Sequence, residues 1–441
     1  MGKIFLLICI ICQLGSIADT INCAKKRKDA VYDFIVVGSG AGGGTVASRL
    51  ALNGFKVLVI EAGPDYNTRN STIPNFAAFA QDDAVIRWDY HPYTFNKSIN
   101  QTILYPRASA VGGCTRHTEL VTFAANPSDW DNIANVTGDT SWNHVNMQQY
   151  WELVEKCQYC KTTPLKGGWL NVAQPMRNVP RLMTNPIIAS LFDTMNNNFA
   201  FADDINTHLD QDGWCYLPES SLNGTRQDTY VRLKTVQRSH SSNLYIWPNT
   251  LVTKILTNGG ARKSACGVQY IKGSHLYKAS PLSTHQNTDS LKIQEIYAKK
   301  EIIVSGGQFS TPQLLQLSGI GDKEKLKKFK IKMVHHLPGV GLNLQDRQEV
   351  PYVLKMSGDT RINKDCTLGL TPTDPCLTHY NTTRKSLYAS NGLLLGFLHS
   401  TLPKQAVPEV QCKKNARTDL QSCTPVLHLP SRLEYVIHLR R

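Results

Sequence analysis

The clearest pattern of apolar and polar segments in the chain runs from residue 31 to residue 63. An apolar run at 31–37 is typical of a β-strand, and a glycine-rich turn follows it at 38–43. Residues 45–52 then carry a helix-like pattern, and a second apolar run at 56–60 is typical of another strand. This order of strand, glycine turn, helix and strand predicts a βαβ unit whose two strands lie parallel in one sheet.

The turn of this βαβ unit has the residues that bind a dinucleotide. Gly38 permits the tight turn, Gly40 lets the backbone approach a pyrophosphate, and Gly43 lets the helix pack close to the sheet. The start of the helix offers N–H groups and a positive dipole end to phosphate. Glu61 follows at about the interval at which a carboxylate meets ribose hydroxyls. We interpret the unit as a dinucleotide site; the alternative is a glycine-rich strand turn with an incidental glutamate.

Strand-like segments return in the second half of the chain. They occupy residues 243–247, 251–256, 266–271 and 292–297. The first is expected to extend the nucleotide-binding sheet. The last two are typical of a hairpin into which the polar stretch 273–290 is inserted.

Another strand runs into glycines at residues 301–307. Thr311 and Pro312 form an N-cap and N1 pair, and residues 313–317 continue as a helix. Because this repeats the order of strand, glycine turn and helix, it predicts a second approach to the same cofactor. The pair Gly112–Gly113 is also able to lie against a cofactor, although a simple turn between elements is an equal alternative.

A third feature is an amphipathic helix predicted over residues 143–161. Cys157 and Cys160 fall inside it, and no second pair of cysteines or histidines stands at zinc spacing. A disulfide or free thiols are therefore favoured over zinc, and no metal site is expected. The aromatic run at 87–90 is interpreted as a core or surface cluster rather than as a platform for a flat ligand.

The length of 441 residues and the hydrophobic content of 41% indicate a globular protein with two or three domains, or one divided domain. At the N-terminus, Lys3 precedes an apolar run at 4–12 and the small residues Ser16 and Ala18. This pattern predicts a cleaved signal peptide at 1–18, with an uncleaved membrane anchor as the alternative. No later stretch is long enough to span a membrane, so a secreted or extracellular product is expected.

Two further features fit the secretory route. Ten of the twelve cysteines remain after residue 18, so disulfides are expected, although their pairing cannot be read. Asn-x-Ser/Thr sequences also predict sugars on surface loops. They stand at Asn70, Asn96, Asn100, Asn135, Asn223 and Asn381.

The formal net charge of +14 raises the possibility of nucleic-acid binding. The positive charge gathers at residues 25–28, at residues 323–332 and in the last thirty residues. No basic motif interleaved with aromatic residues accompanies it, so no nucleic-acid partner is expected. A solvated face, or a polyanion-rich extracellular setting, explains the charge better.

Three separated stretches together resemble the glucose-methanol-choline (GMC) family of FAD-dependent oxidoreductases. The first is residues 33–43 with Glu61-Ala62-Gly63, and the second is Pro106-Arg107 through Thr115. The third runs from Gly307 through Ser318-Gly319-Ile320-Gly321 and on to residues 337–346. The resemblance covers roughly residues 31–411.

The resemblance implies an α/β and α+β fold with FAD as cofactor. A Rossmann-like FAD-binding domain would be built from the discontinuous segments 31–63, 106–142 and 225–345. A substrate domain with an antiparallel sheet and helices would comprise 64–105, 143–224 and 346–411, and the tail 412–441 is unlike the family.

The resemblance also implies which residues line the cofactor. Val252 would contact the adenine through its backbone, and Gly112, Gly113 and Cys114 would lie along the flavin and pyrophosphate. The full set is Gly38, Ser39, Gly40, Gly42, Gly43, Glu61, Ala62, Arg107, Gly112, Gly113, Cys114, Val252 and Gly306. Thr118 stands where the family has an asparagine near the flavin, and His117 is interpreted as a packing residue.

The reaction implied is oxidation of a CH–OH group of an alcohol or sugar to a carbonyl, with oxygen or another acceptor taking the electrons. The family's general base is a histidine in a C-terminal segment, and the likeness stops after Gln411. We transfer that role to neither His428 nor His438, so no catalytic residue is assigned. The chain is therefore interpreted as a shortened oxidoreductase. The alternatives are a catalytically impaired flavin-binding or interaction protein, and an incomplete sequence.

Overall fold

The computed structural model describes residues 22–92, 102–160, 167–207, 212–258, 263–284, 291–344, 365–398, 410–414, 421–425 and 433–435. The expected signal peptide, Asn96, Asn100, His428 and His438 lie outside these ranges. The chain forms two compact units. Unit 1 comprises Met1–Thr72, Ala77–Thr118 and Gln227–Gln348, and unit 2 comprises Ile73–Phe76, Glu119–Arg226 and Glu349–Arg441.

Unit 1 is built on a sheet with the strand order β11-β2-β1-β14-β13-β12. The predicted βαβ unit is confirmed as β1 (Tyr32–Val37), α3 (Ala41–Leu52) and β2 (Val57–Ile60). The two strands are parallel, with Val36 opposite Val59. β11 (Leu244–Trp247) extends the sheet in parallel beyond β2, as the sequence predicts.

The other side of the sheet is antiparallel. β12 (Thr250–Thr257) pairs with β13 (Ala265–Lys272), and β13 pairs with β14 (Gln294–Val304), which confirms the predicted hairpin. The prediction of separate strands at 292–297 and 301–305 is wrong, because β14 is one continuous strand. Lys299 and Lys300 are exposed positions within it. β14 begins antiparallel to β13 and ends parallel to β1.

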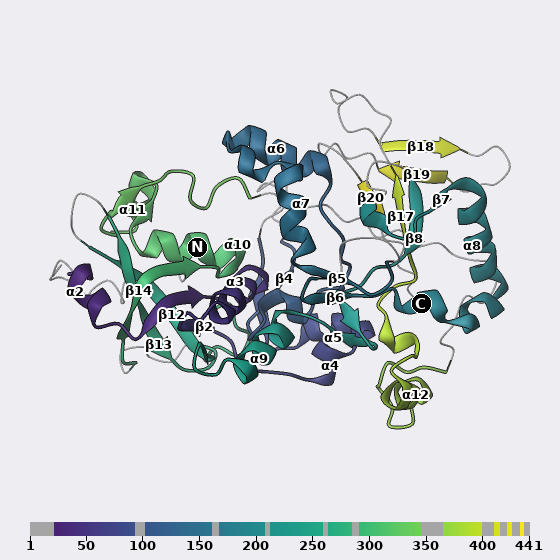
Figure 1. The fold of residues 1–441 in the computed structure, drawn as a ribbon, viewed down its shortest axis with the longest axis horizontal. Coiled ribbons are helices and arrows are strands. Elements are labelled where there is room, and N and C mark those ends of the chain that lie inside the picture. Colours follow the sequence, from purple (N-terminus) through teal and green to yellow (C-terminus); the bar gives the residue numbers. More distant parts are fainter. Residues whose placement is uncertain are drawn as a thin grey trace. The chain divides into compact units, whose positions relative to one another are not determined.

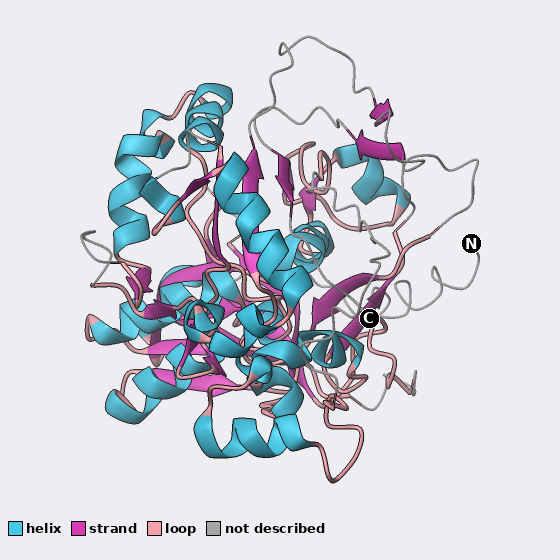
Figure 2. Ribbon diagram, turned by 90° about the vertical axis from the view of Figure 1, so that its right-hand side faces the viewer, coloured by secondary structure: helices cyan, strands magenta, loops and turns pink. Residues whose placement is uncertain are grey.

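Alternate residues of β1 face two separate cores. Phe34 and Val36 pack on one face with Ala47 of α3 and Leu233 of α9 (Thr229–Ser239). Ile35 and Val37 face the opposite side, where Leu314 of α10 (Gly307–Leu317) and residues of β12 and β13 cover the sheet. Burial of alternate residues on both faces is the main stabilisation of a parallel strand. In Figure 1, α3 and α9 lie beside the strands of this unit, and Figure 2 shows helices flanking the strands.

The helix after β14 begins earlier than predicted. We expected Thr311 and Pro312 to start it, but α10 begins at Gly307 and contains Pro312 in its interior. Ser305 fixes the preceding turn, because its backbone N–H donates to Val37 O and its hydroxyl donates to Gly38 O. Pro312 then removes a single backbone hydrogen bond from the helix.

Shorter elements complete unit 1. They are α2 (Cys23–Lys28), α4 (Arg69–Thr72), α5 (Ala77–Asp82), β3 (Arg87–Tyr90), β4 (Tyr105–Ala108), η3 (Gly113–Arg116), β15 (Ile320–Gly321), α11 (Lys323–Lys328) and β16 (His335–His336). β3 and β4 form an antiparallel pair with Trp88 opposite Arg107. A disulfide joins Cys23 of α2 to Cys266 of β13.

Unit 2 contains a small sheet with the strand order β20-β17-β8-β7. Its strands are β7 (Ala200–Phe201), β8 (Gly213–Tyr216), β17 (Leu394–Leu398) and β20 (Leu433–Tyr435). β8 and β17 are antiparallel, and α8 (Pro186–Asn198) packs Ile188 and Phe192 against Trp214.

Outside this sheet lie α6 (Pro127–Thr137), α7 (His144–Glu152) and α12 (Pro375–Thr383), the hairpin β9–β10 (Ser221–Leu222, Thr225–Arg226), and β18–β19 (Val410–Lys414, Gln421–Pro425). Short 3-10 turns are η1 (Pro74–Phe76), η4 (Thr140–Trp142), η5 (Pro175–Asn178), η6 (Pro180–Thr184), η7 (Ile205–Thr207) and η9 (Leu387–Ala389).

The helix predicted over 143–161 is wrong in its second half. α7 ends at Glu152, and residues Glu155–Cys157 form β5, which pairs in parallel with β6 (Leu170–Val172). Val154 O accepts hydrogen bonds from the backbone N–H groups of Trp169 and Leu170. A partner strand distant in sequence therefore takes the backbone groups that a longer helix would have used.

The limits of the two units differ from the expected domains. Residues 64–72 and 77–105 belong to unit 1, in which β3 pairs with β4. Residues 119–142 belong to unit 2, where α6 packs against α7. Within the described ranges, no helix has both the length and the apolar character needed to cross a membrane. The same ranges contain no group of three acidic, histidine or cysteine side chains placed to hold a metal.

Candidate dinucleotide site

The candidate site lies in unit 1, where the parallel strands end. Gly38, directly after β1, has φ +92° and meets the residues that follow β14. A Cβ on Gly38 would lie 2.4 Å from Ser305 O and 3.0 Å from the Cα of Gly306. The two glycine turns predicted from separate segments are therefore in backbone contact, and a side chain at Gly38 would separate them.

The third glycine segment meets the first. Gly113, with φ +54°, begins η3, and a Cβ there would lie 2.6 Å from the Cα of Gly40. Gly40 is the N-cap of α3. The structure thus brings together Gly38, Gly40, Gly113 and Gly306, which come from three stretches of the sequence.

These glycines leave three helix starts without a side-chain cap. Gly40, Gly112 and Gly306 are the N-cap residues of α3, η3 and α10, and as glycines they offer no side chain to cap the first N–H groups. By contrast, the Asp228 side chain caps α9. Around the start of α3, Ala41 and Gly42 are exposed, and a Cβ on Gly42 would meet nothing within 4 Å. Exposed N–H groups at a helix start are the donors that bind phosphate.

Glu61 follows β2 and is buried beside this cradle. Its Oε2 accepts from the backbone N–H of Ser39 at 3.0 Å and from the Ser39 hydroxyl at 2.6 Å, and its Oε1 accepts from Gly63 N at 3.0 Å. Burial raises the pKa of Glu61, while the hydrogen bonds from Ser39 and Gly63 oppose the shift. The predicted carboxylate is therefore fixed against the glycine turn, and the backbone N–H of Ala62 beside it also hydrogen-bonds Glu61.

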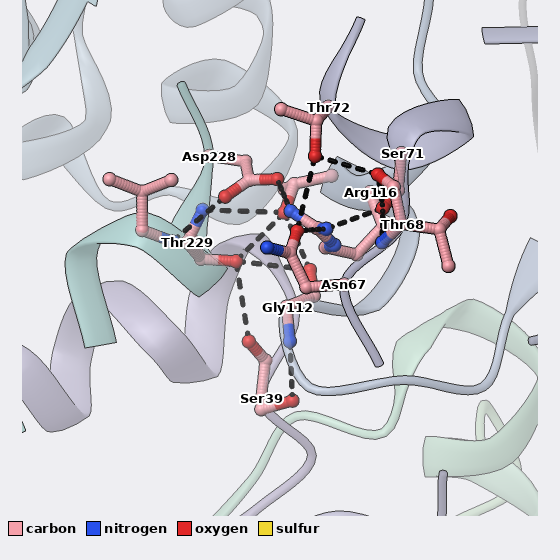
Figure 3. Close-up of polar contacts among 11 residues, drawn as sticks. Ser39, Asn67, Thr68, Ser71, Thr72, Gly112, Arg116, Asp228 and Thr229 are labelled. Atoms are coloured by element: carbon pink, nitrogen blue, oxygen red, sulfur yellow. Dashed lines mark hydrogen bonds and ion pairs between the residues drawn. The ribbon is translucent and has the colours of Figure 1, made fainter. Parts of the chain in front are cut away.

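The Ser39 hydroxyl links the first and third glycine segments. It accepts a hydrogen bond from Gly112 N at 3.0 Å while donating to Glu61. Gly112 O accepts from the hydroxyls of Thr115 and Thr229 at 2.6 and 3.0 Å (Figure 3). Hydrogen bonds at both its N–H and its carbonyl oxygen thus fix the backbone of Gly112.

Arg116, at the end of η3, is an almost fully buried cation that the sequence analysis missed. It forms an ion pair with Asp228 at 2.5 Å and donates to Asn67 Oδ1 and Ser71 Oγ at 2.6 Å (Figure 3). Its guanidinium lies 4.4 Å from the ring centroid of Tyr230. These contacts tie η3 to α4 and α9. An arginine after Gly112-Gly113 was the available signal, but its partner 112 residues away was not.

Arg107 and Cys114 lie on the same part of the site. Cys114 Sγ accepts from Ala108 N at 3.4 Å, and Cys114 is a free cysteine. Burial raises the pKa of the Cys114 thiol, with Arg107 opposing the shift. The guanidinium of Arg107 lies 4.4 Å from the ring centroid of Tyr105.

The aromatic residues of β3 form a cluster, as the sequence predicts. The Tyr90 ring lies 4.8 Å from that of Phe309, and Trp88 packs edge-on against Tyr277 at 5.2 Å. The Tyr90 hydroxyl also meets Ser310 Oγ at 3.1 Å. This cluster packs β3 against the first turn of α10, next to Gly306.

Val252 lies on β12, close to the end of β2. Thr250, two residues before it, donates its N–H to Glu61 O at 2.9 Å. The pairing of β12 with β13 slips between Val252 and Lys254. Such a bulge interrupts the ladder and frees backbone groups, which suits a residue expected to contact adenine through its backbone. His117, which the sequence suggests is a packing residue, is buried. Thr118, at the place where the family has an asparagine, is exposed.

The fold and the site define a class of protein: an α/β protein with a Rossmann-like unit that has a glycine turn of the dinucleotide-binding type and a buried carboxylate beside it. The model of the GMC oxidoreductase family matches residues 32–349. The chain belongs to the GMC oxidoreductase family, as the sequence resemblance predicts.

Curated relatives show the same likeness. The chain is 30% identical over 331 residues to a glucose dehydrogenase [FAD, quinone] of Drosophila pseudoobscura pseudoobscura, which covers 73% of this chain and 48% of that protein. It is 29% identical over 324 residues to an oxygen-dependent choline dehydrogenase of Citrobacter koseri, which covers 72% of this chain and 54% of that protein. The chain thus spans about half the length of these two relatives.

Solved structures share the fold. A formate oxidase variant of Aspergillus oryzae has a TM-score of 0.70 at 21% identity, covering 84% of this chain and 62% of that one. An FAD-dependent oxidoreductase from Chaetomium thermophilum has a TM-score of 0.64 at 25% identity, covering 83% and 62%.

The cofactor of the family is FAD, and the described residues fit it. Gly113 has no room for a side chain against the backbone of Gly40, while the adjoining residues of α3 are exposed and Gly40 offers no side-chain cap. This arrangement leaves donors for a pyrophosphate, and Glu61 places a carboxylate beside them.

A second buried residue missed by the sequence analysis lies in unit 2. Glu219 is fully buried, and its Oε1 accepts from Asn391 N at 2.7 Å and from Ser390 Oγ at 2.9 Å. Burial raises the pKa of Glu219 to about 8. An isolated glutamate in a loop-rich stretch gave no local signal of such burial.

Proposed function

We propose that this chain is the flavin-binding part of an oxidoreductase that oxidises a CH–OH group of an alcohol or sugar to a carbonyl. Membership of the GMC family supports the proposal, as do relatives named for the oxidation of glucose and choline. The structural observation that carries it is the meeting of three uncapped glycine turns beside Glu61.

Each group of residues has a role in this proposal. The start of α3, with Gly38, Gly40, Gly42 and Gly43, would bind the pyrophosphate through backbone N–H groups. Glu61, held by Ser39, would accept hydrogen bonds from ribose hydroxyls. The chemistry that FAD supplies when bound is acceptance of a hydride from the substrate carbon.

The remaining predicted residues would line the cofactor along its length. Gly112, Gly113 and Cys114 would lie beside the flavin end with Arg107 and Gly306, and the backbone of Val252 would contact the adenine. Unit 2 would act as the substrate domain. We assign no residue as the general base that removes the hydroxyl proton.

We also propose that the protein is secreted and carries N-linked sugars. Asn135, Asn223 and Asn381 are exposed acceptors in the described chain, and disulfides join Cys23 to Cys266, Cys157 to Cys160, and Cys366 to Cys376. Disulfides of this kind persist in oxidising compartments. Mass shifts on treatment with a glycosidase would test the sugars directly.

The experiment for the main proposal is to secrete the chain from eukaryotic cells and record its visible spectrum. Flavin absorbance that bleaches on anaerobic addition of glucose, choline or a simple alcohol supports the oxidoreductase. Flavin absorbance without bleaching by any of a broad panel contradicts turnover by this chain and favours a flavin-binding protein. A colourless, folded product contradicts cofactor binding as well.

A further inference from the structure

The pair Cys157 and Cys160 lies in unit 2, outside the candidate dinucleotide site. Cys157 is the last residue of β5, and the two cysteines form a disulfide with their Cα atoms 5.7 Å apart. The backbone N–H of Cys160 donates to Cys157 Sγ at 3.1 Å. Cys157 is buried, whereas Cys160 is partly exposed. Cys160 is therefore the more accessible residue of the pair, and Cys157 is the shielded one.

A buried carboxylate meets the more exposed sulfur. Asp204 Oδ2 lies 3.2 Å from Cys160 Sγ, and Asp204 is 5% exposed. Its Oδ1 accepts from the backbone N–H of Asn206 at 3.0 Å, which fixes the carboxylate. A disulfide sulfur has no hydrogen to donate, but a thiol does. The contact becomes a hydrogen bond when Cys160 is reduced, with one proton held between sulfur and oxygen.

A second buried carboxylate, Glu155, stands beside the first. Its Oε2 accepts from Trp151 Nε1 at 2.8 Å and from Asn206 Nδ2 at 3.1 Å, while its Oε1 is buried with no hydrogen-bond partner among the described residues. Burial and the charge of Asp204 raise the pKa of Glu155 to about 7. Glu155 therefore keeps its proton up to near-neutral pH beside the carboxylate of Asp204.

We propose that Cys157–Cys160 is a thiol–disulfide exchange site whose substrate is a dithiol, and that Asp204 transfers the proton at Cys160. A thiolate of the dithiol attacks Cys160 Sγ, the bond between Cys157 and Cys160 breaks, and Cys157 leaves as a thiolate. The second thiol of the substrate then attacks its own mixed-disulfide sulfur, and Cys160 leaves and takes a proton through Asp204. The protein disulfide becomes a dithiol, the substrate becomes a disulfide, and both substrate thiol protons end on the two cysteines.

The chain has an internal comparison for this reactivity. Cys23 and Cys266 are 6% and 1% exposed, so neither sulfur is open to an external thiol. Cys215, a buried free cysteine, has its pKa raised by burial and by Asp204, which keeps it as a thiol. Because the thiolate is the nucleophile, Cys215 does not compete in the exchange.

The first test uses the complete chain, secreted and oxidised, with dithiothreitol as the dithiol. Thiols exposed at increasing dithiothreitol are alkylated and located by peptide mass spectrometry, while tryptophan fluorescence reports folding. We expect Cys157 and Cys160 to be labelled in the folded protein at least about tenfold faster than Cys23 and Cys266. Labelling of all four together, or labelling of Cys157 and Cys160 only after unfolding, would overturn the proposal.

The second test is Asp204→Asn, which keeps the shape of the side chain and removes its proton transfer. We expect reduction of Cys157–Cys160 to slow by roughly 100-fold, the scale of a lost general acid. Asp203→Asn is the matched control, because Asp203 is the adjacent carboxylate and pairs with Arg177. Equal rates in the two variants would overturn the role of Asp204.

The dependence of the rate on pH gives a readout that a structural role would not change. The titratable groups that interact with Asp204 are Glu155, Tyr159 and Cys215, and Arg177 acts on Tyr159. After correction for the thiolate fraction of dithiothreitol, the wild-type rate is expected to fall as pH rises through 7, since Glu155 beside Asp204 loses its proton. A flat wild-type profile contradicts the proposal even if Asp204→Asn fails to fold.

Discussion

At the scale of single residues, the cofactor site depends on backbones that touch. Gly113 and Gly40 belong to different stretches of the sequence, and a Cβ on Gly113 would lie 2.6 Å from the Cα of Gly40. Neither atom belongs to a flexible side chain, so the contact has no simple way to relax. Gly113 is therefore required by contact as well as by its positive φ of +54°.

Gly113→Ala is expected to abolish bound flavin, because the added methyl group pushes η3 away from the start of α3. The measurement is the ratio of visible to ultraviolet absorbance of the purified protein. Gly54→Ala is the matched control, since Gly54 also has a positive φ, +86°, but nothing lies within 4 Å of its Cβ position. That variant should lose about 1–2 kcal/mol from backbone strain and retain flavin. Loss of flavin in both variants would show that strain, not contact, decides the site.

Burial of the Glu219 carboxyl in unit 2 makes the free energy of unfolding depend on pH. Because its pKa is about 8 in the folded state, above the ordinary value of 4.5 for a glutamate, the folded protein binds one more proton than the unfolded chain between these values. Its contribution to the free energy of unfolding is therefore fully present below pH 4.5 and is lost as pH rises towards 8. The expected slope approaches about 1.4 kcal/mol per pH unit.

Glu219→Gln is expected to flatten this slope between pH 5 and pH 8, since a neutral amide replaces the buried acid. Urea unfolding followed by tryptophan fluorescence at several pH values measures it. Glu324→Gln, at an exposed position of α11, serves as the control and should follow the wild type. A steep slope that persists in Glu219→Gln would contradict the assignment.

At the scale of elements, Arg116 joins η3, α4 and α9 through a buried ion pair. A buried pair is weak evidence for stability by itself, because removing two ions from water is costly. Breaking it is different, since Asp228 would remain as an unpaired buried charge. The side chains of Arg116 and Asp228 are only 2% and 0% exposed.

Arg116→Met is expected to lower the free energy of unfolding by about 3–5 kcal/mol. The double variant Arg116→Met with Asp228→Asn should recover part of this loss, because an amide still caps α9 without a charge. Lys234→Met, which removes the more exposed pair with Asp65, should cost at most about 1 kcal/mol. Denaturant unfolding of the four proteins measures the effect, and additive losses in the double variant would contradict it.

At the scale of the whole molecule, the disulfide between Cys23 and Cys266 closes the longest loop among the described disulfides, with a sequence separation of 243. It holds α2 against the sheet, where Arg27 also donates to Ala265 O at 2.8 Å. Closing a longer loop removes more conformational entropy from the unfolded chain than closing a shorter one.

Replacing Cys23 and Cys266 by alanine is expected to destabilise unit 1 by about 5 kcal/mol in the chain-entropy model. Replacing Cys366 and Cys376, with a separation of 10, should cost unit 2 about 3 kcal/mol by the same reasoning. Calorimetric melting of each double variant measures the losses. A smaller loss for the longer loop would show that local contacts, rather than loop closure, dominate.

The sequence by itself determined the βαβ unit, the glycine turns and Glu61, because these features repeat at local spacings that one type of structure requires. It also indicated the family and FAD through the order of three motifs. Its errors lie where a distant partner decided local structure. The helix predicted over 143–161 stops short because β5 pairs with β6. The two expected strands are one strand, β14, which pairs first with β13 and then with β1.

Only the tertiary structure decided which distant residues meet. It paired Cys23 with Cys266, set Asp228 against Arg116, buried Glu219, and placed Asp204 on the sulfur of Cys160. None of these contacts follows from a local pattern, since each joins segments whose side chains look ordinary in their own neighbourhood. Long-range packing sets the burial and charge of such groups, and burial and charge determine their chemistry.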